Sequence, residues 1–399
     1  QAVARQLFDA HGPALAASRA PITIEGLDPP WLALGMLEVT AGPGYTPTIR
    51  LIQADPLELL DGCSLADITP LLESGRVEWF VGPDAAEQVA ASIDRLPGLA
   101  HEGPVVQLQT LRTPVGPGLG RALQAAMARQ AEAHRRNAAV IRERDADAAP
   151  RIARVASEDR PPRVALIAGR FTTVLRPMAE DLTAAFEARG CQTRFITEPS
   201  DHRTLTPAAY TAAFADFDPD LVVCANHTRD DMDRLLGEHV MPRAVPWVTW
   251  IQDAMPHLLR PEAGAAIGPA DLAVGHITDA MLDRFGYPAD RSLRTPMVAS
   301  ERKFNPDRVD PDLARELACE AAAFTNHSET PERMRARLID EVSGSAHAAS
   351  IVDQIATRVL ELATRPPSTV RARAACAEIV DALAPGADAA TRENLLENV

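Results

Sequence analysis

The feature that most constrains the fold of this chain is a regular alternation of short apolar runs with longer segments of helical periodicity. In the first quarter of the chain, apolar runs of strand length lie at residues 21–26, 48–53 and 76–82. Helix-like patterns cover residues 31–40 and 56–72 between them. Strands that alternate with helices predict a parallel sheet with helices packed on its faces. We therefore expect a Rossmann-like α/β domain over residues 1–115.

The same alternation resumes after residue 162 and is clearest there. Apolar runs lie at residues 164–169, 192–197, 220–225, 247–251 and 272–274. Helical patterns lie between them at residues 177–189, 207–217 and 230–239. Gly190 follows the first of these helices at a position where glycine commonly ends a helix. This repeated βα pattern is typical of a doubly wound sheet, which we expect to cover residues 156–330.

Two other stretches contain no strand pattern. Residues 119–147 are rich in Ala, Arg, Glu and Gln and contain no Pro, which predicts one long helix that joins the two α/β domains within a linker over residues 116–155. The glycines of residues 116–120 lack the spacing of a phosphate-binding loop. After residue 330 the apolar spacing is helical, in segments at residues 332–342, 349–363 and 370–383. We therefore expect a helical tail over residues 331–399.

Composition excludes several classes of function. The net charge of −15 disfavours a general electrostatic grip on nucleic acid. The five cysteines form no CxxC pair, so we expect neither a disulfide framework nor a metal site. No run approaches the ~18 apolar residues of a membrane span, and the first residues do not have the pattern of a secretory signal. These features favour a soluble, cytoplasmic protein that binds polar small molecules or other proteins and holds no cofactor of its own.

The predicted topology selects candidate site residues in the second domain. Ligands of an open parallel sheet bind outside the carboxyl ends of its strands. Arg170 and Thr172 follow the first strand, where they form either a polar ligand site or a βα turn with a capping threonine. Asn226 and His227 follow the third strand. His227 is a candidate general base or sugar ligand, and the alternative is a helix start.

In that alternative, Thr228 caps the next helix, and Asp230 and Asp231 lie in its first turn, where they complement the helix dipole.

The stretch after the fourth strand is the most informative. Gln252 and Asp253 follow Trp250 and Ile251 directly, and His257 lies four residues further on. This order predicts an amide and a carboxylate at the crevice, with Trp247 and Trp250 either packed below it or facing a sugar ring. The alternative makes Asp253 the former of an Asx turn ahead of Pro256. Two further polar residues follow later apolar runs in the same way, His276 and Asn326.

The segment from about residue 163 to 338 resembles the spore-maturation CgeB-like family of GT-B glycosyltransferase-like proteins. The motifs that carry the resemblance lie at residues 164–169, 218–223, 246–253 and 324–331. The N-terminal region, with its motifs at residues 44–47, 53–56 and 76–83, more weakly resembles the domain that accompanies motility-associated glycosyltransferases.

This resemblance implies transfer of a sugar, by a hexosyltransferase type of reaction, from a nucleotide-sugar donor to a protein or glycan acceptor. Asp253 or His227 would be the catalytic base. The residues that would bind substrate are Arg170, Thr172, Asn226, Gln252, His257, His276 and Asn326.

In GT-B enzymes a second Rossmann half holds the donor, and this chain ends without one and opens without an initiator Met. We therefore expect a fragment that contains the acceptor half. A non-catalytic GT-B-like scaffold that binds a glycan or a partner protein is the main alternative. A dehydrogenase or methyltransferase ranks last, because no complete glycine fingerprint follows any strand. Homo-oligomer formation is left open.

Overall fold

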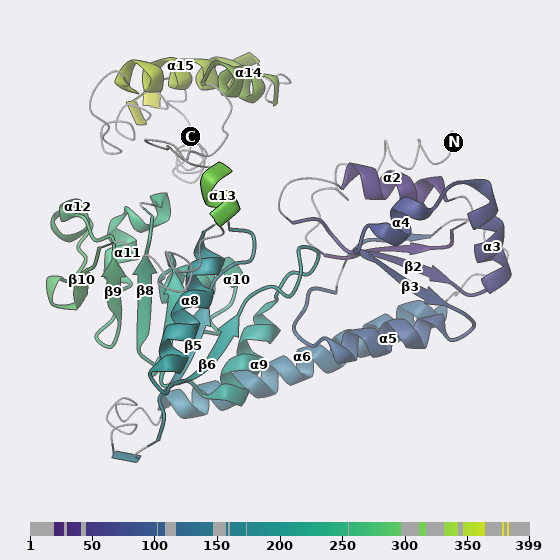
Figure 1. Ribbon diagram of the computed structural model, residues 1–399, viewed down its shortest axis with the longest axis horizontal. Helices are drawn as coiled ribbons and strands as arrows, with labels where there is room; N and C mark the ends of the chain where they lie inside the picture. The colour runs from purple at the N-terminus through teal and green to yellow at the C-terminus, as the bar shows by residue number, and fades with distance from the viewer. Residues whose placement is uncertain are drawn as a thin grey trace. The chain divides into compact units, whose positions relative to one another are not determined.

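The computed structural model (Figure 1) describes residues 20–27, 30–40, 45–101, 103–107, 117–146, 157–158, 160–172, 174–253, 255–296, 311–316, 331–341, 346–363, 377–378 and 381–382. The chain divides into two compact units, residues 1–304 and residues 305–399. The first unit contains two sheets, and every strand pair in both sheets is parallel. The mixed α/β fold with two parallel sheets is therefore confirmed.

The first sheet has the strand order β3-β2-β1-β4. Its strands are β1 (Ile22–Glu25), β2 (Ile49–Gln53), β3 (Val77–Val81) and β4 (Val105–Gln107). All residues of β1 and β2 are buried, as expected for a parallel sheet that helices cover on both faces. The helices of this domain are α2 (Trp31–Val39), α3 (Pro56–Leu65), α4 (Thr69–Glu73) and α5 (Ala85–Arg95).

Two apolar clusters hold these helices to opposite faces of the first sheet (Figure 1). On one face, Ile24 and Leu51 pack with Met36 of α2 and Leu71 of α4. The other face buries α5, together with the first turns of α6 (Pro117–Ala146). Each cluster removes large aliphatic side chains from water, and this is the main stabilising contribution to a layered fold.

Helix α6 is 30 residues long and follows β4 in the chain. Its Arg129 pairs with Asp94 of α5 through two contacts of 3.1 and 2.6 Å. Near its C-terminal end, Asp145 accepts hydrogen bonds from the backbone of Arg243 and Ala244 at 2.7 and 2.8 Å. These contacts hold the middle of α6 to α5 and its C-terminal end to the segment before β8. The predicted long helix begins two residues earlier than expected and reaches Ala146.

The second sheet has six strands in the order β10-β9-β8-β7-β5-β6. They are β5 (Arg163–Ile167), β6 (Gln192–Ile196), β7 (Leu221–Ala225), β8 (Trp247–Ile251), β9 (Leu272–Gly275) and β10 (Ser292–Arg294). The connecting elements are α8 (Leu175–Ala188), α9 (Pro207–Phe217), α10 (Arg229–Leu236), η1 (Pro256–Leu258), α11 (Pro261–Ala265), α12 (Asp279–Asp283) and η2 (Ala289–Arg291). The chain winds outward in one direction to β6 and in the other from β7, so the topological switch point lies between β5 and β7.

One predicted helix differs from the structure, and some elements of the structure were not predicted. The helix predicted for residues 56–72 is two helices, α3 and α4, because the chain is extended at Ala66. We did not predict α5, β4 or β10. Strand β10 has three residues with little burial, and β4 also has three, so neither presents the apolar run from which strands were inferred.

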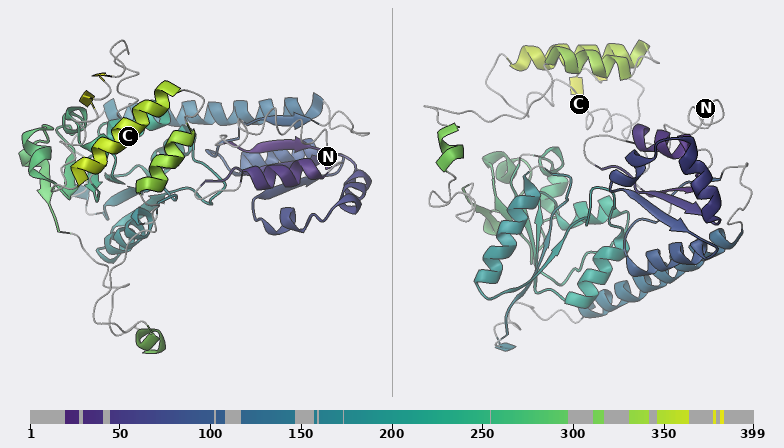
Figure 2. Two further views of the ribbon diagram at one scale, coloured as in Figure 1. Left: turned by 90° about the horizontal axis from the view of Figure 1, so that it is seen from above. Right: turned by 45° about the vertical axis from the view of Figure 1, so that its right-hand side comes forward.

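The second unit is described by three helices, α13 (Pro311–Glu316), α14 (Pro331–Glu341) and α15 (Ala346–Ala363). Helices α14 and α15 lie side by side (Figure 2), and Arg335 Nε donates to Asp353 Oδ1 at 2.7 Å between them. Both helices match predicted segments. Most of the predicted helix at residues 370–383 lies outside the described residues.

Candidate functional site

The carboxyl ends of β7 and β8 are joined by one buried side chain, that of Asn226. Its Oδ1 accepts hydrogen bonds from the backbone N–H groups of Gln252 and Asp253, at 2.8 and 3.3 Å. Its Nδ2 donates to Oδ2 of Asp253 at 3.0 Å. The pairing of Ala225 with Trp250 brings the residues that follow these two strands together. One hydrogen bond from Asn226 therefore holds the Asp253 carboxylate, and the other two fix the backbone of Gln252 and Asp253.

The backbone of Asn226 is itself unusual. Its φ is 56°, in the left-handed region, and the residue is only 2% exposed. Asparagine is among the few non-glycine residues that adopt this conformation readily. Residues held in sparsely populated conformations cluster at functional sites, where the surrounding structure compensates for the strain. The observation directs attention to this edge of the sheet.

Asp253 and Gln252 differ sharply in their surroundings. Asp253 is exposed to solvent, although its carboxylate is held by Asn226. Gln252 is 9% exposed, and within the described part of the chain its buried Oε1 has no hydrogen-bond partner. The turn after β8 is closed by the backbone carbonyl of Asp253, which accepts from Met255 N at 2.9 Å. Its side chain is thus directed to Asn226 instead of forming the hydrogen bond of an Asx turn to Met255.

Two histidine rings stack next to this clamp. The centroids of His227 and His257 are 4.8 Å apart, with an angle of 15° between the planes. Nε2 of His257 lies 2.7 Å from the carbonyl oxygen of Asn226, and since that oxygen can only accept, Nε2 donates. Burial, followed by the neighbouring His257, lowers the pKa of His227 to about 4. His227 is therefore neutral at pH 7.

Asp231 lies next to these histidines, although the sequence predicted only its place in the first turn of a helix. Thr228 caps α10, and the Thr228 and Asp231 side chains form a reciprocal capping box, so the predicted capping role is confirmed. Oδ1 of Asp231 accepts hydrogen bonds from Arg234 and Arg260. Burial acts to raise the pKa of Asp231, but the hydrogen bonds from Thr228 together with the nearby His257 and Arg234 outweigh it, and the pKa is lowered. Asp231 is thus a buried, ionised carboxylate.

The ligand atoms of His227, Asp231 and His257 all lie within 4.8 Å of one another. Beneath them, Trp247 is buried and donates from Nε1 to the carbonyl of His227 at 3.2 Å. Of the two predicted positions for this tryptophan, the structure shows the packed one.

The remaining predicted residues make other contacts. Nε of Arg170 pairs with Asp201 at 2.5 Å, on the loop after β6. Oγ1 of Thr172 donates to the carbonyl of Gly169 at 3.1 Å and accepts from the N–H of Arg176 at 3.2 Å, as in a βα turn with a capping threonine.

His276 is exposed, and its N–H donates to Ile251 O at 2.8 Å, which places its backbone beside the end of β8. Asn326 lies outside the described residues. The structure therefore groups Asn226, His227, Gln252, Asp253 and His257. The catalytic and binding roles of all these residues remain predictions.

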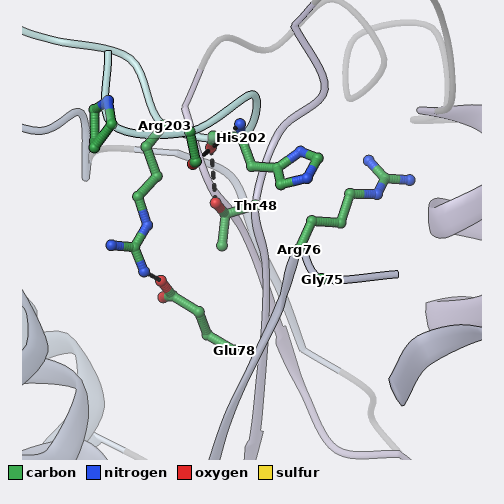
Figure 3. A pocket seen from close by; sticks show the side chains of 8 residues that line it. Thr48, Gly75, Arg76, Glu78, His202 and Arg203 are labelled. Atoms are coloured by element: carbon green, nitrogen blue, oxygen red, sulfur yellow. Dashed lines mark hydrogen bonds and ion pairs between the residues drawn. The ribbon is translucent and has the colours of Figure 1, made fainter. Parts of the chain in front are cut away.

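A cavity of about 190 Å³ lies elsewhere, where the loop after β6 meets the amino ends of β2 and β3 (Figure 3). Arg203 reaches Glu78 at 2.5 Å, and Thr48 Oγ1 donates to the carbonyl of His202 at 2.7 Å. The Arg76 guanidinium donates to carbonyl groups at the end of α2 and to that of Pro47. The polar groups named here already have partners within the protein, so this cavity has less to offer a ligand than the edge at Asn226.

Comparison of the chain with protein-family models, with curated proteins and with solved structures gives no significant match. Within the described residues, no helix combines the length and the apolar character needed to cross a bilayer. The resemblance to glycosyltransferases thus remains a prediction from the motifs themselves.

Proposed function

We propose that the edge formed by the carboxyl ends of β7 and β8 is the acceptor site of a GT-B-type glycosyltransferase, with Asp253 as the general base. In this reaction the Asp253 carboxylate takes the proton of an acceptor hydroxyl. The hydroxyl oxygen attacks the anomeric carbon of a nucleotide-linked sugar, and the bond from that carbon to the nucleotide diphosphate breaks. The acceptor is a protein or a glycan.

The observation that carries this proposal is the clamp made by Asn226. A catalytic base must reach its substrate and be held in one orientation. Asp253 meets both requirements, because its side chain is exposed to solvent and its carboxylate is hydrogen-bonded by a buried amide. Residues at strand ends near a switch point are where open α/β sheets bind their ligands. We prefer Asp253 to His227 as the base, because Nδ1 of His227 is buried, whereas the Asp253 side chain is exposed.

Other side chains would bind the acceptor. The Oε1 of Gln252 is buried and has no partner among the described residues, so a turn of this amide toward solvent would let it accept from a sugar hydroxyl. Exposed His276 lies beside the end of β8. Arg170 and Thr172 would border the site from the loop after β5. The nucleotide-sugar donor would be bound mainly by the second half of a GT-B enzyme, joined through the helices after residue 330. We therefore expect this chain alone to bind nucleotide sugars weakly.

The test is a transfer assay with the longest natural form of the protein. UDP-glucose, UDP-N-acetylglucosamine and GDP-mannose are incubated with oligosaccharides and hydroxyl-containing peptides, and nucleotide diphosphate release is measured. Asp253→Asn should lower turnover by roughly 10²–10⁴-fold. Asp216→Asn is the matched control, because the Asp216 carboxylate is 71% exposed and pairs with Arg194 on the surface. This variant should retain full turnover.

The outcomes separate the alternatives. Equal turnover of the Asp253→Asn and Asp216→Asn variants would exclude Asp253 as the base. Saccharide binding, detected by saturation-transfer NMR, without any transfer would favour the non-catalytic scaffold. Calorimetry that finds low-micromolar binding of a nucleotide sugar to the present chain would show that the donor site is misplaced.

A further inference from the structure

The cluster of His227, Asp231 and His257 is built from three separate elements. His227 follows β7, Asp231 lies in the first turn of α10, and His257 is part of η1. One ligand atom from each residue can be chosen so that all three lie within 4.8 Å of one another. Asp231 is 4% exposed, and the two imidazole rings stack at 4.8 Å. Two imidazoles and a carboxylate so close together form a donor set used by transition metals.

Each of the two rings has a nitrogen that can bind a ligand. Because Nε2 of His257 donates to the Asn226 carbonyl, Nδ1 is the nitrogen of that ring left for a ligand. A backbone carbonyl that fixes the ring in this way is a common outer partner of a metal-binding histidine. Within the described part of the chain, the buried Nδ1 of His227 has no hydrogen-bond partner. A buried nitrogen without a partner is costly, and coordination of a metal to the ring would offset that cost.

We propose that His227, Asp231 and His257 bind one zinc ion, with water as the fourth ligand. Zinc accepts nitrogen and oxygen donors in a tetrahedral arrangement, and a site with three protein ligands keeps one position for water. This proposal departs from the absence of metal expected from the cysteine pattern. It concerns binding of an ion and is independent of sugar transfer.

The present contacts of Asp231 define what must change when the ion binds. Zinc ligands lie at about 2.0–2.2 Å from the metal, so the three donor atoms must approach one another. The two stacked rings are nearly parallel, so one of them must turn before both can direct a nitrogen at one ion. The Asp231 carboxylate also accepts from Thr228, Arg234 and Arg260. Arg234 is the partner most readily displaced, because its side chain is 56% exposed, against 15% for Arg260. Arg234 is therefore a competitor of the metal for Asp231.

The experiment titrates the metal-free chain with Co²⁺, whose visible d–d bands report tetrahedral coordination, and then displaces it with Zn²⁺. We expect one ion per chain. His257→Ala and His227→Ala should each weaken binding by about 100-fold or more, since loss of even an outer partner costs 10–100-fold. His239→Ala is the matched control, because the His239 side chain is 88% exposed and follows the same helix; it should leave the affinity unchanged.

A second variant tests the competition directly. Arg234→Ala should strengthen Co²⁺ binding up to roughly fivefold, because it removes an exposed cation that competes for the Asp231 carboxylate. Asp231→Asn removes the capping carboxylate of α10 and can unfold that helix, so its result is used only if circular dichroism shows a native spectrum. The proposal is overturned if the wild-type chain gives no tetrahedral spectrum, or if His257→Ala and His239→Ala bind Co²⁺ equally. No sugar is present in these titrations, so either result leaves the proposed transfer reaction to its own test.

Discussion

Replacing Asn226 by glycine and by alanine separates the two roles of this residue. Both variants lose the three hydrogen bonds to Gln252 and Asp253. At about 1 kcal/mol each, this loss amounts to roughly 2–3 kcal/mol of unfolding free energy, since one of the bonds is long. Only alanine also retains a side chain that disfavours the φ of 56°, which costs about 1–2 kcal/mol.

The order of stability is therefore expected to be wild type, then Asn226→Gly, then Asn226→Ala, with about 1 kcal/mol between the two variants. This order is the reverse of that at an ordinary strand position, where glycine is the less stable residue by roughly 0.5–1 kcal/mol. Ala225→Gly supplies that comparison one residue earlier, at the end of β7. Ala225→Gly is expected to lower the unfolding free energy, with no relief of backbone strain to offset the loss.

The assay is urea denaturation followed by tryptophan fluorescence, to which Trp247 and Trp250 of β8 contribute. The comparison requires that the variants have equal m-values, which are the slopes of unfolding free energy against urea concentration. Variants with equal m-values differ in stability alone. If Asn226→Ala proves as stable as Asn226→Gly, the left-handed conformation carries no strain. If both match the wild type, the clamp contributes nothing to the fold.

Three further predictions concern groups away from Asp253. Arg229→Met should lower the unfolding free energy by about 3–5 kcal/mol in urea titrations, because it leaves Asp271, only 6% exposed, as an unpaired buried charge. Burial lowers the pKa of His101 to about 4, so the unfolded chain binds the extra proton below pH 6.5. His101 alone should lower stability by at most about 1.4 kcal/mol per pH unit between pH 6.5 and pH 4. His101→Gln should therefore reduce the slope of the thermal-melting profile, and the part that remains is due to His227, whose pKa is also lowered to about 4. Gly264→Ala should cost about 1–3 kcal/mol, because its Cβ would lie 2.0 Å from a backbone carbonyl oxygen, whereas Gly118→Ala meets open space and should be neutral or slightly stabilising.

The strength of the apolar signal determined how well each element was predicted. Strand β8 has the bounds expected from its five apolar or β-branched residues, Trp247–Ile251. Helix α5 is an exception, because it was not predicted although its buried residues Ala85, Ala86, Val89 and Ile93 recur at the spacing of one helix face. The split between α3 and α4 depends on a local backbone turn at Ala66. Propensity and periodicity do not resolve such a turn.

At the site, the sequence predicted which residues lie at the edge of the sheet, but it did not predict which of them contact one another. Because parallel strands end at one edge, the residues after β7 and β8 could be placed there from the strand pattern alone. The pairing of Ala225 with Trp250 then decides that Asn226 faces the backbone of Gln252 and Asp253, and this register is a tertiary property. Asp231 shows the converse case. The helix dipole already explains why an acidic residue stands in the first turn of α10. Nothing in the local sequence therefore indicates that η1 brings His257 close to Asp231, because His257 lies 26 residues further along the chain. A residue with a sufficient local explanation can thus acquire a second role through tertiary contacts, and those contacts must be known before the role can be tested.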